Sequence, residues 1–278
     1  MNNFVKSHGL GNDYIVLDIE KINFKLTPKL IKKICHRNYG IGSDGILLLI
    51  KSIKADFGLK IFNPDGTEAE KSGNGLRIFS KFLFDYKYTK KKSFSIETKG
   101  GVVRSEVKTK NSKVELVKVE MGTAIFEAKK IPVYTKKEVV LKEKLKIKNK
   151  VLTFSSVSIG NPHCVIFTNS LSAKTAIELG EIIEKHKIFP SRTNVQFAKI
   201  LSKKEVMVEI WERGAGYTLA SGSSSCGVVA VGFKLGLLGE KVRVIMPGGI
   251  LNIEIDNDYN IIMQGPVEEI CSGQLSFK

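Results

Sequence analysis

Landmarks in the first half of this sequence return in the second half at a constant offset, and this repeat constrains the fold more than any other feature. Gly11-Asn12 precedes one apolar run, and Gly160-Asn161 precedes another 149 positions later. The same offset relates two further pairs, Ser72-Gly73 with Ser221-Gly222 and Gly100 with Gly249. Unrelated loops would have drifted in length, so the chain is predicted to be a duplicated domain with the same order of elements in each half.

Each half contains short strands, then a glycine turn, a helix and further strands. Strand-like apolar runs occupy residues 46–50, 57–62, 94–98 and 102–107. Helices are expected over about 73–86 and 222–237, and the second is apolar nearly all round, as is typical of a helix buried on most sides. This pattern predicts an α+β fold of two similar, pseudo-twofold-related domains, each a mostly antiparallel sheet wrapped around a central helix. The expected domains are 1–121 plus 265–278, and 122–264.

The charge balance raises the question of a nucleic-acid partner. The 278 residues include 44 Lys plus Arg against 28 Asp plus Glu, a net charge of +16. The lysines are spread through segments such as 90–92 and 136–150, where they alternate with glutamate and apolar residues. No zinc-finger spacing or RNP-like motif accompanies them. We therefore expect a solvated lysine-rich surface and no nucleic-acid partner; the alternative is that the charge provides a long-range field for a small acidic substrate.

Other classes of protein are disfavoured by the absence of their sequence features. No run approaches the roughly 18 to 20 apolar residues of a membrane-spanning helix, and the first residues are polar and glycine-bearing. The sequence therefore predicts a cytoplasmic protein without a membrane partner. The cysteines at positions 35, 164, 226 and 271 are widely scattered. Free buried thiols are expected, with neither disulfides nor a zinc site.

The two glycine turns before the predicted helices carry the chemistry. A helix start leaves backbone N–H groups unpaired, and these groups can hold an anion such as a carboxylate. If the two equivalent helix starts face one interdomain cleft, residues 72 and 221 lie on opposite faces of the α-carbon of a bound amino acid. That is the geometry of a two-base racemase or epimerase. Each serine alone is equally well explained as an N-cap.

Short motifs follow one another along almost the whole chain. They are His8-Gly9-Leu10-Gly11-Asn12-Asp13, Gly40-Ile41-Gly42-Ser43-Asp44-Gly45, Asn63-Pro64-Asp65-Gly66, Gly73-Asn74-Gly75-Leu76-Arg77, Gly160-Asn161-Pro162-His163, Glu212-Arg213-Gly214-Ala215-Gly216 and Pro247-Gly248-Gly249. In this order they resemble the motifs of the diaminopimelate epimerase family. The resemblance implies that each chain has two similar domains, that two chains can form a homodimer, and that the reaction needs no cofactor. That reaction is the pyridoxal-independent isomerisation of LL- to meso-diaminopimelate in lysine and peptidoglycan synthesis, with this amino acid as the small-molecule partner.

The resemblance also assigns site residues, and it implies no metal ligands. Its catalytic positions fall on Ser72, Ser221, His163 and Glu212. Its substrate contacts fall on Asn12, Asn63, Gly73, Asn74, Asn161, Asn194, Glu212, Arg213, Gly222 and Ser223. Arg213 can pair bidentately with a distal carboxylate, and Glu212 can accept a hydrogen bond from a distal ammonium group.

The chain departs from the family at the two most important positions. Family members carry cysteine where this chain has Ser72 and Ser221. A thiol titrates near about 8.5 but a serine hydroxyl at about 13 or above, a gap of about 5 to 6 kcal/mol, and no dedicated base is evident for either serine. The protein is therefore expected to bind substrate but turn it over poorly. Tyr217 stands where the family usually has glutamate, and Lys71 where an apolar residue is common.

Several alternatives remain open at this stage. The paired serines fit either deliberate replacement of two cysteines by a near-isosteric residue or natural divergence of a relative. A non-catalytic amino-acid-binding protein would keep the ligand set and lack both bases. An isomerase of another amino acid would normally lose part of the distal clamp, which is intact here. The charge alone would fit a nucleic-acid-binding protein.

Overall fold

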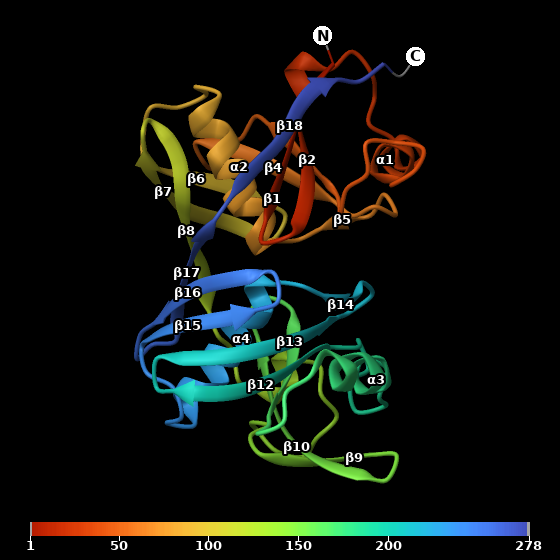
Figure 1. Cartoon of the computed structure of the whole chain (residues 1–278), viewed down its shortest axis with the longest axis vertical. Helices are drawn as coiled ribbons and strands as arrows, with labels where there is room; N and C mark the ends of the chain where they lie inside the picture. Colours follow the sequence, from red (N-terminus) through yellow and green to blue (C-terminus); the bar gives the residue numbers. More distant parts are fainter. Residues whose placement is uncertain (1, 277–278) are drawn as a thin grey trace. The chain divides into compact units, whose positions relative to one another are not determined.

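The chain divides into two compact units, each with its own core and its own series of paired strands. The computed structural model describes residues 2–276. Unit 1 runs to Glu120 and resumes at Gln264, and unit 2 is Met121–Met263. Figure 1 shows the elements of each unit along the chain.

Unit 1 is built from a sheet, two helices and one short 3-10 helix. Its strands are β1 (Asn3–Gly9), β2 (Asn12–Asp18), β3 (Ile46–Ile50), β4 (Phe57–Phe62), β5 (Glu68–Ala69), β6 (Ser93–Thr98), β7 (Gly101–Lys110), β8 (Lys113–Thr123) and β18 (Glu268–Gln274). Its helices are η1 (Ile19–Lys21), α1 (Pro28–Cys35) and α2 (Gly73–Asp85). β8 extends past the boundary at Glu120 into unit 2.

Unit 2 contains the same kinds of element, and from β10 to β17 they follow the order that unit 1 has from β1 to β8, except for the 3-10 helix, which precedes the strands here. Its strands are β9 (Glu143–Ile147), β10 (Lys150–Ser158), β11 (Pro162–Phe167), β12 (Asn194–Ser202), β13 (Glu205–Glu212), β14 (Gly216–Thr218), β15 (Lys241–Met246), β16 (Gly249–Ile255) and β17 (Asn260–Pro266). Its helices are η2 (Ala128–Lys130), α3 (Ala173–Glu184) and α4 (Gly222–Lys234). β17 extends past Met263 into unit 1.

The strand pairings of the two units match step for step. In unit 1, β1–β2 is antiparallel, β2–β3 parallel, β3–β4 antiparallel, β4–β6 parallel and β6–β7 antiparallel. In unit 2, the pairs β10–β11, β11–β12, β12–β13, β13–β15 and β15–β16 repeat this series of directions. The helices α2 and α4 begin and end 149 positions apart. The α+β class and the duplication predicted from the sequence are therefore confirmed.

The central helix of each unit packs against its own sheet. Helix α2 contacts β1, β2 and β7, and helix α4 contacts β10, β11, β12 and β16. Most of the residues of both helices are buried, including the polar side chains of Asn74 and Arg77 on α2. This burial explains why the sequence of α4 is apolar nearly all round, since no face of the helix is reserved for water.

Each unit has a second helix that the sequence analysis missed. Helix α1 starts at a capping Thr27, whose Oγ1 accepts the Leu30 N–H at 3.3 Å, with Pro28 in its first turn. It turns Ile31 and Ile34 into the core. In unit 2, α3 begins after the capping Ser172. Capping threonine and serine signals mark both starts, but α1 is too short for its periodicity to stand out.

Three of the four cysteines, Cys35, Cys164 and Cys226, are buried free thiols as expected. Cys271 is exposed on β18, so the expectation of burial is wrong there because every described residue of that strand is exposed. Within the described residues, no helix is both long and apolar enough to cross a membrane.

Candidate active site

Helix α2 begins at a serine cap. Ser72 is half-buried with an extended backbone (φ −137°, ψ 118°), and its Oγ accepts the Gly75 N–H at 3.0 Å. Gly73 and Asn74 are the first two residues of the helix, where N–H groups have no partner within the helix itself. The cap stabilises the helix, and the same end can hold a carboxylate.

Helix α4 begins in the same way. Ser221 has nearly the same backbone conformation (φ −145°, ψ 127°), and its Oγ accepts the Ser224 N–H at 3.4 Å. Gly222 and Ser223 are the first two helix residues. The side chain of Ser221 is buried, so the two capping serines differ in exposure but share one geometry.

Asn12 is held beside the start of α2. Its Oδ1 accepts a hydrogen bond from Asn74 Nδ2 at 3.0 Å, and its Nδ2 donates to Asp44 Oδ2 at 2.8 Å. The structure thus brings together the predicted residues Asn12 and Asn74 next to Ser72. Asp44, which sequence reasoning missed, orients the amide because a carboxylate can only accept.

An ion-pair cluster built around the buried Asp13 supports Asp44. Arg37 binds both oxygens of Asp13 at 2.8 and 2.9 Å and reaches Asp44 Oδ1 at 2.6 Å, and Lys6 lies 3.1 Å from Asp13. Burial raises the pKa of the Asp13 carboxyl, but hydrogen bonds from Arg37 and Lys6 outweigh burial and leave that pKa below its usual value. The residues Asp13 and Asp44 stand in the His8–Asp13 and Gly40–Gly45 motifs, yet their pairing through Arg37 required the fold.

In unit 2, His163 orients Asn161. The imidazole is fully buried, and its Nε2 lies 2.9 Å from Asn161 Oδ1, while its Nδ1 lies 3.1 Å from Gln196 Nε2. Burial, and then the positive charge of Arg213, lower the pKa of His163 to about 3. A neutral ring that accepts from Gln196 must carry its proton on Nε2 and donate it to Asn161. The Asn161 Nδ2 group then points to Ser223 Oγ at 3.5 Å.

Glu212 is the last residue of β13 and Arg213 follows it, and the backbone of Arg213 is held by a hydrogen bond. Asn194 Oδ1 accepts the Arg213 N–H at 3.0 Å, and Asn194 Nδ2 donates to the Pro162 carbonyl at 2.9 Å. The Arg213 guanidinium is exposed and donates to the Ser191 carbonyl at 3.1 Å. Both polar atoms of the Asn194 amide are therefore hydrogen-bonded to the protein backbone. These bonds position the backbone of Arg213.

Glu184 is a further support that sequence reasoning missed. Its buried carboxylate at the end of α3 accepts the Trp211 Nε1–H at 2.8 Å and the Gly214 N–H at 3.1 Å. These contacts tie both sides of the Glu212-Arg213 segment to α3. No local pattern reveals this role, because 27 to 30 positions separate the partners in the sequence.

Two predicted positions have local partners of their own. Asn63 Nδ2 donates to Thr67 Oγ1 at 3.0 Å within the turn between β4 and β5. This side-chain hydrogen bond is separate from the one that joins Asn12 and Asn74. Tyr217 donates to Glu209 Oε2 at 2.6 Å, and burial and this carboxylate raise its pKa to about 12. The Tyr217 ring packs against the hydrophobic core beside α3. Although Tyr217 lies only four positions before Ser221, the Ser221 cap has the same geometry as the Ser72 cap.

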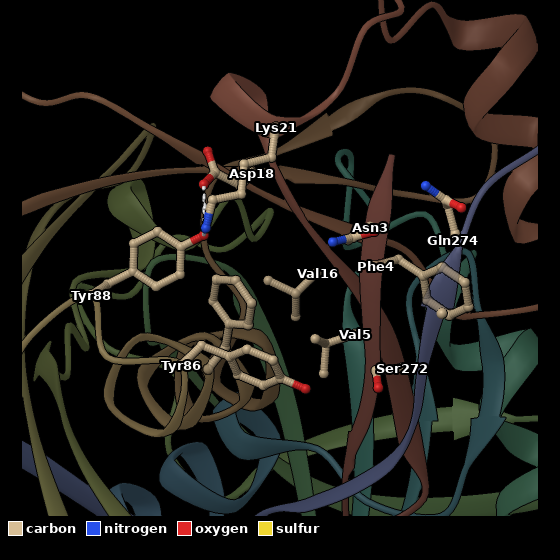
Figure 2. Close-up of a pocket in the computed structure, with 12 residues that line it drawn as sticks. Asn3, Phe4, Val5, Val16, Asp18, Lys21, Tyr86, Tyr88, Ser272 and Gln274 are labelled. Carbon is tan, nitrogen blue, oxygen red and sulfur yellow. Dashed lines mark hydrogen bonds and ion pairs between the residues drawn. The ribbon is translucent and has the colours of Figure 1, made fainter. Parts of the chain in front are cut away.

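A cavity of about 410 Å³ lies elsewhere in unit 1, near the opposite end of α2 from Ser72. Figure 2 shows Val5 and Val16 in it and the polar group of Asp18, Lys21 and Tyr88 at one side. Tyr88 donates to Asp18 Oδ2 at 2.6 Å and accepts from Lys21 Nζ at 2.7 Å. None of the residues that line this cavity is a predicted site residue.

The described residues 2–276 contain no group of three or more His, Cys, Asp or Glu side chains that could hold a metal ion. The groups that the site residues of the two units offer a ligand include two helix starts, oriented amides, hydroxyls and the Arg213 guanidinium. Such groups bind carboxylates and move protons.

Comparison with known proteins gives concordant results. A sequence model of the family described as "Diaminopimelate epimerase" matches residues 4–127 and 155–270. "Diaminopimelate epimerase 2" from Nostoc sp. is 51% identical over 98% of this chain and 95% of its own length. A diaminopimelate epimerase from Pelotomaculum thermopropionicum is 41% identical over 99% of both chains.

Solved structures share the fold. A probable proline racemase from Agrobacterium radiobacter superposes with a TM-score of 0.75 at 14% identity, covering 100% of this chain and 94% of that chain. A hydroxyproline epimerase from Agrobacterium vitis gives 0.75 at 13% identity, covering 99% and 90%. Identities this low support the architecture alone, whereas the sequence matches extend over nearly the whole length of both chains. On that ground the chain belongs to the diaminopimelate epimerase family.

Proposed function

We propose that this protein acts on diaminopimelate as an epimerase, interconverting the LL and meso isomers by proton transfer at one α-carbon. One observation supports this most strongly. Both units present a serine-capped helix start with an oriented asparagine beside it. Asn12 binds Asn74, the second residue of α2, and Asn161 lies 3.5 Å from Ser223, the second residue of α4. A reaction that removes a proton from one face and returns it to the other needs such a duplicated set.

Each site residue has a role that follows from its chemistry. The N–H groups of Gly73, Asn74, Gly222 and Ser223 bind the substrate's α-carboxylate and stabilise the negative charge that develops when the α-proton leaves. Ser72 and Ser221 serve the two faces of the α-carbon. Arg213 pairs with the distal carboxylate, and Glu212 accepts from the distal ammonium group.

The asparagines complete the recognition. Asn12 and Asn161 are pre-oriented by Asp44 and His163, so little freedom is lost when a ligand binds them. We assign neutral His163 a positioning role, because its two nitrogens already bind Asn161 and Gln196. Asn194 acts through the Arg213 backbone, and Asn63 is the weakest member of the set because it is engaged with Thr67.

The serines limit the rate that this chain can reach. They stand where the family carries cysteine, and a hydroxyl is a far weaker acid than a thiol. We therefore propose slow turnover with retained binding. A non-catalytic binding protein is the second candidate, favoured by one observation: each serine hydroxyl accepts a helix N–H, as a structural cap does.

Calorimetric titration with LL- and meso-diaminopimelate tests the substrate class, with lysine, glutamate and histidine as competitors. Lysine retains the amino groups but lacks the distal carboxylate, so it should bind far more weakly if Arg213 holds that group. Arg243→Ala is a matched control, because Arg243 is half-exposed and pairs with Glu205 in the same unit. Equal affinity for lysine and diaminopimelate would contradict the proposal.

Two further expectations accompany this function. We propose a cytoplasmic location, where diaminopimelate for lysine and peptidoglycan synthesis would be made, and a homodimer as a possible assembly. Light scattering on the purified protein measures the second directly. A mass of one chain at micromolar concentration would exclude a stable dimer.

A further inference from the structure

A phenol hydroxyl touches one of the two serines. Tyr14 lies on β2, and its hydroxyl is 3.2 Å from Ser72 Oγ. Ser72 Oγ accepts the Gly75 N–H at 3.0 Å, and its own proton can still be donated to the phenol, since either oxygen can be the donor in their contact. The sequence gives no hint of this contact, because 58 positions separate the two residues.

The backbone makes room for the Tyr14 ring. A Cβ atom added at Gly45 would lie 2.7 Å from Tyr14 Cε1 and 2.4 Å from the Phe62 carbonyl oxygen, too close for any side chain. The tyrosine is buried, with 8% of its surface exposed. Burial of the ring and the close approach of the Gly45 backbone therefore hold the hydroxyl at Ser72.

The second unit uses the equivalent position differently. The residue 149 positions after Tyr14 is His163, whose ring nitrogens face Asn161 and Gln196. Ser221 Oγ accepts from the Ser224 N–H. The two serines therefore have unequal surroundings although their caps are alike.

We propose that Tyr14 is a positioning residue that takes and returns the hydroxyl proton of Ser72, so that Ser72 can accept the substrate's α-proton without becoming a free alkoxide. This inference rests on the proposed function. A phenol is about three pKa units more acidic than a serine hydroxyl, so a phenolate is the more accessible base.

The transfer starts from Tyr14 that has lost its phenol proton to solvent, a state that becomes accessible as the pH approaches the usual phenol pKa of about 10, and it then proceeds as one concerted step. The Cα–H bond breaks and its proton forms a new O–H bond on Ser72. The original O–H bond of Ser72 breaks, and that proton forms the phenol of Tyr14. The negative charge of the phenolate ends on the α-carbon and its carboxylate, beside the N–H groups that begin α2.

Deuterium exchange into diaminopimelate in D₂O, read by mass spectrometry, tests this step. The unsubstituted protein should incorporate deuterium slowly, with retained configuration and for one α-carbon configuration only, because Ser72 alone has the phenol. Tyr14→Phe removes only the hydroxyl and should slow exchange by about 100-fold, the lower range for a lost acid–base group, with diaminopimelate affinity changed by less than about twofold. Tyr39→Phe, at an exposed tyrosine, is the matched control and should change neither quantity.

A second background separates a proton-transfer role from a structural one. In Ser72→Cys the thiol needs no phenol, so adding Tyr14→Phe should alter exchange by less than about threefold. An equal loss in both backgrounds would overturn the proposal and leave Tyr14 a packing residue. Binding without any exchange by the unsubstituted protein would also overturn it while leaving the substrate assignment intact. Absence of diaminopimelate binding would overturn the proposed function itself.

Discussion

Placing cysteine at positions 72 and 221 together tests whether the two capped helix starts form a proton-transfer pair. Both hydroxyls accept the third N–H of their helix, at 3.0 and 3.4 Å, so a sulfur atom at either place meets the positive end of that helix. This position lowers a thiol's pKa. The gap between hydroxyl and thiol exceeds about 4 pKa units, or about 5 to 6 kcal/mol. If this whole difference appears in the activation barrier, the double cysteine variant should epimerise about ten-thousand-fold faster than the serine-bearing protein.

The assay follows conversion of LL- to meso-diaminopimelate by chromatographic separation of the isomers. Ser72→Cys and Ser221→Cys singly should recover little epimerisation, because the opposite face still lacks a competent acid. Ser172→Cys is a matched control, since Ser172 caps α3 with the same kind of hydrogen bond, to the Thr175 N–H at 3.2 Å. A double variant that binds substrate as before yet stays inactive would refute the reasoning and show that the scaffold has diverged beyond its two cysteines.

Three further predictions concern unit 2. Arg213→Ala should weaken diaminopimelate binding by about 2 to 5 kcal/mol in calorimetry, and Arg213→Lys should also bind worse because the planar fork is lost. Glu184→Ala should lower the free energy of unfolding in urea by about 1 to 3 kcal/mol, since it leaves the Trp211 and Gly214 N–H groups without their acceptor; no change would contradict this role. Burial, then Arg213, lower the His163 pKa to about 3, so below pH about 6.5 only the unfolded state takes up that proton. The free energy of unfolding should therefore fall as the pH is lowered from 7 to 5, and His163→Gln should make this dependence on pH shallower. An unchanged dependence on pH would argue against a neutral buried ring.

The repeat was the part of the fold most accessible from sequence. The expected helix over 73–86 is Gly73–Asp85 in the structure, and its counterpart begins at Gly222 as expected, but ends three residues early at Lys234. These segments were readable because glycine turns and dense apolar runs mark them locally. Helix α1 was missed because eight residues give too little periodicity.

The partners of the site residues were not accessible from sequence. The motifs named Asn12 and Asn161, but what orients them, Asp44 in one unit and His163 with Gln196 in the other, follows from strand order. The contact between Tyr14 and Ser72 likewise needs β2 to lie against the start of α2. Local pattern identifies candidate ligands, whereas tertiary structure decides which side-chain atoms remain for a substrate.

A crystal structure of this serine-bearing protein with meso-diaminopimelate would show whether both helix starts hold one substrate, because slow turnover keeps the substrate intact. The account predicts the α-carboxylate on the N–H groups of both Gly73-Asn74 and Gly222-Ser223, the distal carboxylate on Arg213, and the Ser72 and Ser221 hydroxyls on opposite faces of one α-carbon. A ligand bound to only one of the two helix starts, or at the cavity beside Tyr88, would contradict it.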